Sequence, residues 1–206
     1  MKTEVIQVGV LATNCYIVSD DTTNECVVID PGGESARIED HLENAALTPT
    51  FVLATHAHGD HTGAAKSLVE KYGAQFLIGI HDVAAVNQQL EWLVSMLGDF
   101  QDPPVPNRGL EHGDKLTVGQ VEIEVLSTPG HTPGSVSFYV EGHVYTGDTL
   151  FRETIGRFDL SGGDEDKEIA SIKKVLFELD DTTLVLPGHG PSSTIGHEKI
   201  ANMFVR

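Results

Sequence analysis

The fold of this chain is decided by one stretch, Phe51-Val52-Leu53-Ala54-Thr55-His56-Ala57-His58-Gly59-Asp60-His61. Its first four residues are apolar, as in a strand that is buried on both faces, and polar residues follow at once. Three imidazoles and one carboxylate then fall within six positions, at the point where the strand ends. Neutral imidazole and carboxylate are ligands that suit Zn²⁺ and its first-row neighbours. The stretch therefore predicts a metal site at the end of a strand.

The same pattern, in which an apolar run ends in Gly, Pro, Asp or His, recurs along the chain. It is seen where Val27-Val28-Ile29 runs into Asp30-Pro31-Gly32-Gly33, Val121 to Leu126 into Thr128-Pro129-Gly130-His131, Val144-Tyr145-Thr146 into Gly147-Asp148, and Leu184-Val185-Leu186 into Pro187-Gly188-His189. Glycine in such turns lets the backbone hold a short side chain toward a shared point. With His131, Asp148 and His189, the candidate ligands number seven, which is enough for two metal ions.

Apolar residues at three- and four-residue spacing predict helices between these strands. We expect helices over Thr62 to Tyr72, Asp164 to Leu179 and Asp82 to Leu97; in the last, Trp92, Leu93, Met96 and Leu97 are expected to face the core. Asp99 to Arg108, which contains Pro103, Pro104 and Pro106, is expected to be a loop. Strands that alternate with helices predict an α/β protein. Because both halves hold candidate ligands, residues 1–206 are expected to form one domain.

Charge and composition exclude several classes of partner. Thirteen Lys and Arg stand against thirty-one Asp and Glu, a formal charge of -18 that repels phosphate backbones and anionic lipids. Neither nucleic acid nor a membrane is therefore an expected partner. The N-terminus does not resemble a secretory signal, and Cys15 and Cys26 are expected to be buried free thiols, so we expect a cytoplasmic protein. The sequence does not indicate an oligomeric state.

These motifs, in this order, resemble the metallo-β-lactamase superfamily, and within it the short, single-domain glyoxalase II-like hydrolases of the hydroxyacylglutathione hydrolase type. The similarity runs essentially from end to end. It includes Thr13-Asn14-Cys15-Tyr16, Asp30-Pro31-Gly32-Gly33, the motifs above, Gly156-Arg157-Phe158-Asp159 and Gly188-His189-Gly190-Pro191. The resemblance implies a four-layer αββα sandwich with a metal centre at one edge, between the two sheets.

The resemblance also implies a role for each ligand. His56, His58 and His131 would hold the first ion, Asp60, His61 and His189 the second, and Asp148 would bridge both. Asp60 and Asp148 would be the catalytic carboxylates, and Asp30 would orient a ligand imidazole. Zn²⁺ is the expected metal at both positions, with Fe or Mn as alternatives, because His and Asp ligands suit several divalent ions.

A hydroxide shared by two divalent ions forms near neutral pH, and the same ions polarise a carbonyl group. The resemblance therefore implies hydrolysis of a small-molecule thioester, either hydroxyacylglutathione or an adduct of a related low-molecular-weight thiol. Arg157 and Phe158 stand where longer relatives place residues that contact the substrate, although Arg157 could instead pair with Asp159. The longer relatives hold glutathione with an additional C-terminal helical region, which we expect to be absent after Arg206.

Other functions remain open. A relative with the same fold is the persulfide dioxygenase, which has a mononuclear iron and uses part of this ligand set. β-Lactamase activity is disfavoured, since no export signal is apparent and Asp148 occupies the bridging position used in thioester hydrolases. A non-catalytic metal-binding protein is a further alternative, but structural zinc is normally held by a closed, Cys-rich set of four ligands.

Overall fold

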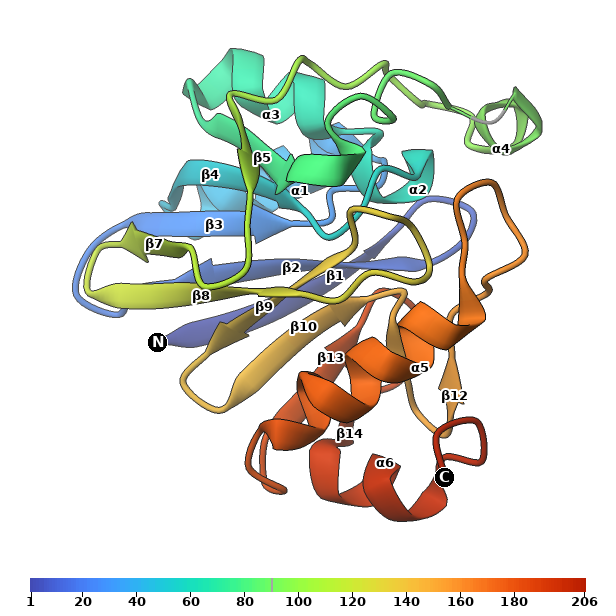
Figure 1. Ribbon diagram of the computed structural model, residues 1–206. Helices are drawn as coiled ribbons and strands as arrows, with labels where there is room; N and C mark the ends of the chain where they lie inside the picture. The colour runs from blue at the N-terminus through green and yellow to red at the C-terminus, as the bar shows by residue number, and fades with distance from the viewer. Residues whose placement is uncertain (90) are drawn as a thin grey trace.

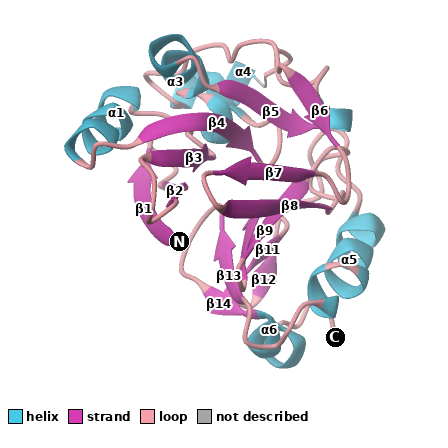
Figure 2. Cartoon of the chain, turned by 90° about the vertical axis from the view of Figure 1, so that its left-hand side faces the viewer, coloured by secondary structure: helices cyan, strands magenta, loops and turns pink. Residues whose placement is uncertain are grey.

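The computed structural model describes residues 1–206 apart from Leu90. Two six-stranded sheets lie face to face, and helices cover the outer face of each (Figures 1 and 2). The predicted four-layer αββα sandwich is therefore confirmed. Among the described residues, no helix has both the length and the apolarity needed to span a bilayer.

The first sheet is antiparallel at its N-terminal side and parallel beyond its third strand. In order across the sheet it contains β1 (Lys2–Val8), β2 (Thr13–Ser19), β3 (Glu25–Ile29), β4 (Thr48–Ala54), β5 (Gln75–Gly79) and β6 (Arg108–Leu110). The crossovers β3–β4 and β4–β5 contain the outer helices α1 (Ser35–Asn44) and α3 (Ala65–Tyr72). The short helix α2 (Gly59–Thr62) lies just before α3, and the 3₁₀ turn η1 (Ile80–Asp82) follows β5.

The second sheet is formed by the C-terminal half of the chain. Its order is β14 (Ser193–Thr194), β13 (Leu184–Pro187), β10 (His143–Gly147), β9 (Val136–Val140), β8 (Val121–Ser127) and β7 (Lys115–Val118). Only β10 and β13 pair in parallel among its strands. Its outer face is covered by α5 (Glu165–Lys174) and α6 (Ile195–Ala201), and the remaining elements here are η2 (Leu176–Glu178) and the hairpin β11 (Leu150–Phe151) and β12 (Thr154–Ile155).

The apolar strands are buried on both faces, which explains why they are almost continuously apolar rather than alternating. In β3, Val27 and Ile29 face the second sheet, whereas Cys26 and Val28 face the helices α1 and α3. Both cysteines are buried and free, as expected. A third apolar cluster lies between the second sheet and the helices α5 and α6.

The loops that follow β4, β8, β10 and β13 meet at one edge of the sandwich. There the two sheets are joined by backbone hydrogen bonds, in which Val136 donates to the carbonyl of Thr55 at 2.9 Å and Asn14 to that of Gly188 at 2.7 Å. Because the carboxyl ends of parallel strands lie at the same edge of a sheet, this arrangement brings side chains from distant segments together.

The helices agree with the sequence predictions in two of three cases. The first corresponds to α2 and α3, and the second to α5, whose start is capped by Asp164, followed by η2. The third is shorter than predicted: among the described residues of that range only α4 (Glu91–Met96) is α-helical, Asp82 ends the 3₁₀ turn η1, and Leu90 lies outside the described residues.

The prediction that Trp92 and Met96 face the core is wrong, since they are 49% and 50% exposed, whereas Leu93 and Leu97 are buried. The physical reason is the position of α4 at the rim of the molecule (Figure 1), where a helix buries only one narrow stripe. Before α4, the Gln89 side chain donates to the carbonyl of Ala57 at 2.7 Å, so contact with the 55–61 loop replaces a regular helix.

Candidate metal centre

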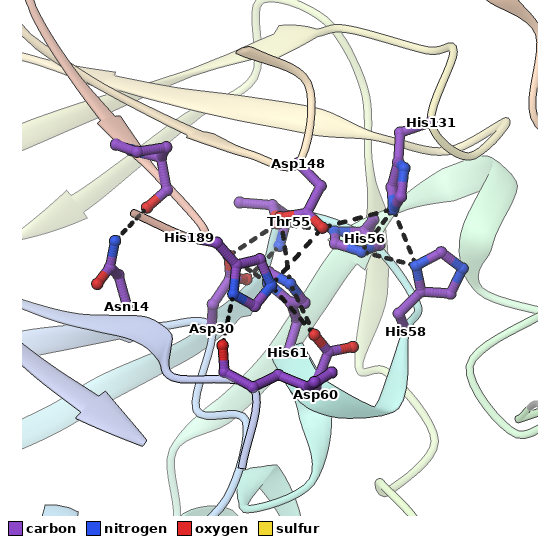
Figure 3. Close-up of polar contacts among 12 residues, drawn as sticks. Asn14, Asp30, Thr55, His56, His58, Asp60, His61, His131, Asp148 and His189 are labelled. Atoms are coloured by element: carbon purple, nitrogen blue, oxygen red, sulfur yellow. Dashed lines mark hydrogen bonds and ion pairs between the residues drawn. The ribbon is translucent and has the colours of Figure 1, made fainter. Parts of the chain in front are cut away.

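All seven predicted ligands lie together at the edge where the strand ends meet (Figure 3). Three groups of side chains each have one nitrogen or oxygen per residue within 4.8 Å of the others. They are His56, His58 and His131; Asp60, His61 and His189; and His56, His61 and Asp148. Each group is one that could hold a metal ion.

The first group consists of three imidazoles from two loops. His131 Nε2 lies 3.2 Å from His56 Nε2 and 2.9 Å from His58 Nδ1, and the last two nitrogens are 3.0 Å apart. Ligands about 2.0 to 2.1 Å from a tetrahedral zinc ion are themselves about 3.3 Å apart. The three nitrogens therefore have nearly the spacing of a tetrahedral site.

Hydrogen bonds on the far side of the rings fix which nitrogens are free. His131 Nδ1 lies 2.7 Å from the backbone carbonyl of Arg157, which can only accept. The hydroxyl of Thr55 donates to Asp30 and therefore accepts from His56 Nδ1 at 3.1 Å. In the neutral rings, both Nε2 atoms then carry lone pairs. Two acceptors 3.2 Å apart cannot form a hydrogen bond with each other, so this arrangement fits a cation between them.

The second group repeats this arrangement. His61 Nδ1 lies 3.0 Å from Asp30 Oδ2, as the predicted orienting role of Asp30 requires, and His189 Nδ1 donates to the carbonyl of Leu11 at 3.1 Å. Their Nε2 atoms face Asp60 Oδ2 at 3.5 and 3.2 Å, respectively. An acceptor outside the centre thus turns each Nε2 inward, which is a common way of orienting metal-ligating histidines.

Asp148 lies between the two groups (Figure 3). One carboxylate oxygen is 3.4 Å from His61 Nε2, and the other is 3.8 Å from His131 Nε2 and 3.7 Å from His189 Nε2. The buried atoms Asp148 Oδ1 and His61 Nε2 have no hydrogen-bond partner in the described part of the chain. Since buried polar atoms normally have partners, these two fit ligands of an ion.

The charges of the two groups differ. Burial lowers the pKa of His56 well below its ordinary value, and burial and the neighbouring His131 lower that of His58 to about 4, so both rings are neutral at pH 7. Burial also opposes a charge on His61, but the carboxylates of Asp148, Asp60 and Asp30 outweigh it and raise the pKa of His61 well above its ordinary value. The second group therefore attracts positive charge strongly.

The two predicted substrate-binding residues are placed differently from the ligands. The Arg157 guanidinium is exposed and donates to both carboxylate oxygens of Asp159, at 2.8 and 3.0 Å. Phe158 packs against the apolar cluster beneath α5. The backbone carbonyl of Arg157, rather than its side chain, contacts the centre through His131.

Three residues that support the centre were not among the predicted site residues. Asn14 donates to the carbonyls of Pro187 and Gly190, both at 2.9 Å, and Tyr16 donates to that of Pro187 at 2.8 Å, so β2 holds the loop that carries His189. Asp82 joins the loop that carries His56 and His58 to the loop that carries His131. Asp82 shares the signal that identified the ligands, a polar residue just after a strand.

A sandwich of two sheets and outer helices, with His and Asp side chains gathered at one edge between the sheets, defines a class of metal-dependent hydrolases. The chain belongs to the metallo-β-lactamase superfamily, since the model of that family matches residues 8–189. It is 38% identical to the probable metallo-hydrolase YqgX of Bacillus subtilis and 34% identical to the hydroxyacylglutathione hydrolase GloC of Haemophilus influenzae. Each similarity covers 100% of this chain and 98% of the relative.

Three solved structures of similar proteins include a metallo-β-lactamase and a di-iron-bound protein. The B3 metallo-β-lactamase BLEG-1 is 34% identical with a TM-score of 0.87, over 99% of both chains. TTHA1623 in a di-iron-bound form is 36% identical with a TM-score of 0.87, over 98% of this chain and 99% of its own. ETHE1 from Myxococcus xanthus is 31% identical with a TM-score of 0.84, over 98% and 84%. The superfamily supports a metal-dependent hydrolase and leaves the metal open.

Proposed function

We propose that this protein hydrolyses small-molecule thioesters at a centre of two divalent metal ions. The observation that carries the proposal is the pair of three-residue groups that share Asp148 between them. His56, His58 and His131 would hold one ion, and Asp60, His61 and His189 the other. Zn²⁺ is our first choice of metal, with Fe or Mn as alternatives, because this donor set suits all three.

A pair of divalent ions supplies, when bound, a hydroxide near neutral pH and an electrophile for a carbonyl oxygen. The chain's own residues supply negative charge and fix the orientation of the side chains around the ions. Asp60 and Asp148 contribute anionic oxygens. The hydrogen bonds to the carbonyls of Arg157 and Leu11 and the ion-pair contact of His61 with Asp30 hold imidazoles in place, so the centre needs little reorganisation during the reaction. A thiolate, with an unperturbed thiol pKa of about 8.5, departs with little help from a protein acid.

A cavity of about 160 Å³ adjoins His58 and offers space for one arm of the substrate. Its described lining residues are Ala57, His58, Asp82, Ala85, Gln88, Gln89, Thr132, Pro133 and Ser161. Neither Lys nor Arg is among them, so this cavity offers no basic side chain to an anionic part of the substrate. The exposed Arg157 is the candidate residue for binding a substrate carboxylate. That carboxylate would replace Asp159 as the partner of the guanidinium.

The similarity to GloC supports a hydroxyacylglutathione or related thioester substrate, and that to ETHE1 supports a second candidate, oxygenation of a persulfide at one iron. The first group of three imidazoles is complete without Asp60, His61 or His189, so one ion could be held alone. Metal content therefore separates the two candidates.

The test is elemental analysis and activity measured on one preparation, with S-D-lactoylglutathione, simpler thioesters, glutathione persulfide and a β-lactam as substrates. We expect about two ions per chain and thioester hydrolysis, both reduced in Asp148→Asn and unchanged in the exposed control Asp180→Asn. One iron per chain with oxygen uptake would favour the dioxygenase. Two ions with hydrolysis of the β-lactam alone, or of no substrate, would refute thioester hydrolysis.

A further inference from the structure

The first group draws its three imidazoles from two loops that are distant in sequence. His56 and His58 follow β4, whereas His131 lies between β8 and β9, in the other sheet. The spacing of their nitrogens therefore depends on how far apart the two loops are held. A residue that bonds both loops would set this spacing.

Asp82 bonds both loops directly. It is the last residue of η1, after β5, and its side chain is buried at 1% exposure. Oδ2 accepts from the backbone N–H of Ala57 at 2.9 Å and from the hydroxyl of Thr132 at 2.8 Å, and Oδ1 accepts from the N–H of Gly134 at 2.7 Å. Ala57 separates His56 from His58, and Thr132 follows His131.

The surroundings of Asp82 keep this geometry fixed. A Cβ atom added to Gly134 would lie 2.3 Å from the backbone nitrogen of Asp82, so the His131 loop rests directly on η1. The hydroxyl of Thr132 donates to Asp82 and accepts from the Ser135 hydroxyl at 2.7 Å. Both carboxylate oxygens of Asp82 are thereby used in holding backbone and side-chain donors.

We propose that Asp82 is a positioning residue that sets the distance between the His56–His58 loop and the His131 loop, and so the affinity for the first ion. This proposal rests on the proposed metal centre. Asp30 has the corresponding place at the second group, where it accepts from Thr55 and contacts His61. Asp82 differs in that its hydrogen bonds go to the backbone of the two loops and to the Thr132 hydroxyl, rather than to a ligand side chain.

Asp82→Asn is the sharpest test, because it keeps the size of the side chain and exchanges one acceptor oxygen for an NH₂ group. The three donors from Ala57, Thr132 and Gly134 then compete for one oxygen, and at least one of them faces another donor. The two loops should shift relative to each other. Residues in this kind of supporting position typically change metal affinity by about 10- to 100-fold.

Asp20→Asn is the matched control. Asp20 is also buried, at 5% exposure, and also accepts from backbone N–H groups in two segments, those of Thr22 and Gln120. Asp20 directly follows β2, whereas Asn14 lies near the other end of that strand. At about 3.3 Å per residue, the two positions are about 20 Å apart. It therefore reports the cost of losing a buried carboxylate away from the centre.

The experiment is titration of the metal-free chain with Co²⁺, followed by visible absorption and calorimetry, with metal content after dialysis. Wild type and Asp20→Asn should bind two ions. Asp82→Asn should bind the ion of the first group about tenfold or more weakly, with the second affinity unchanged. A purely structural role would instead lower the melting temperature of both variants and spare the affinities.

Equal first-ion affinity in Asp82→Asn and wild type, or equal weakening of both sites, would overturn the positioning role alone. A wild-type chain that binds no ion would overturn the metal centre and, with it, this inference. If Asp82→Asn does not fold, the variants Thr132→Val and Thr132→Ser test the positioning role instead. Loss of the hydroxyl should weaken the first site several-fold, and serine, which keeps the hydroxyl, should restore it.

Discussion

Glu168 in α5 is a buried carboxyl group whose replacement by glutamine should change how stability depends on pH. Its side chain is 0% exposed, and neither carboxyl oxygen has a hydrogen-bond partner in the described part of the chain. Burial, with the nearby charge of Asp148, raises the pKa of Glu168 from 4.5 to about 8. The folded chain therefore keeps a proton on Glu168 at neutral pH, where the unfolded chain has lost it.

The sign and size of the effect follow from linkage. Below pH 4.5 both states are protonated and Glu168 has no pH-dependent effect; as pH rises toward 8, only the unfolded state ionises, so the free energy of unfolding falls. At about 1.4 kcal/mol per pKa unit, the difference between 4.5 and about 8 corresponds to about 5 kcal/mol. Relaxation of the surroundings around the buried charge reduces this, and we expect on the order of 2 to 3 kcal/mol.

Glu168→Gln keeps the shape of the protonated side chain and removes its titration. Urea unfolding in the presence of a chelator, from pH 4.5 to 8.5, should show no difference from wild type at the acidic end. As pH rises, the free energy of unfolding of the variant should increasingly exceed that of wild type, by about 2 to 3 kcal/mol at pH 8. Glu178→Gln, an exposed position in η2 that does not contribute to the pKa of Glu168, serves as the control. A difference between variant and wild type that is constant with pH would refute this reasoning.

Two further predictions concern the centre and the substrate. Gly32→Ala should cost at least about 3 kcal/mol in thermal or urea unfolding, because a Cβ atom there would lie 1.6 Å from the backbone oxygen of Asp60; Gly73→Ala, strained only by its positive φ, should cost about 1 kcal/mol. Arg157→Ala should raise KM for an anionic thioester far more than it lowers kcat, whereas an unchanged KM would remove Arg157 from substrate binding.

Much of the fold could be predicted from local sequence because its buried strands end so abruptly. The strand ends before Asp30, His56, Asp148 and His189 are recognisable from sequence, since apolar residues stop where the chain leaves the sheet. The α4 region was less predictable. Its Trp92 and Met96 have helical spacing in the sequence, but whether an apolar stripe meets a core or solvent depends on what packs against it. The single-domain and cytoplasmic assignments stay predictions.

The supporting residues were harder to predict than the candidate ligands. Asn14 and Asp82 act on loops far from them in sequence, and no spacing rule connects residue 14 to residue 187 or residue 82 to residue 132. Arg157 illustrates the converse: its guanidinium was the predicted contact, yet its backbone carbonyl orients His131 while the side chain pairs with Asp159.

The sequence by itself determined the ligand types, their position after buried strands and the α/β class, because these depend on local composition and periodicity; the sandwich was implied by the family resemblance. Only the tertiary structure decided which nitrogen of each ring faces the centre and how Asp148 lies between the two groups. It also decided that the side chains of Glu168 and Asp82 are buried and that of Arg157 is exposed. Those properties depend on distances between segments that meet only after folding, and hydrogen bonds and pKa values respond to such distances directly.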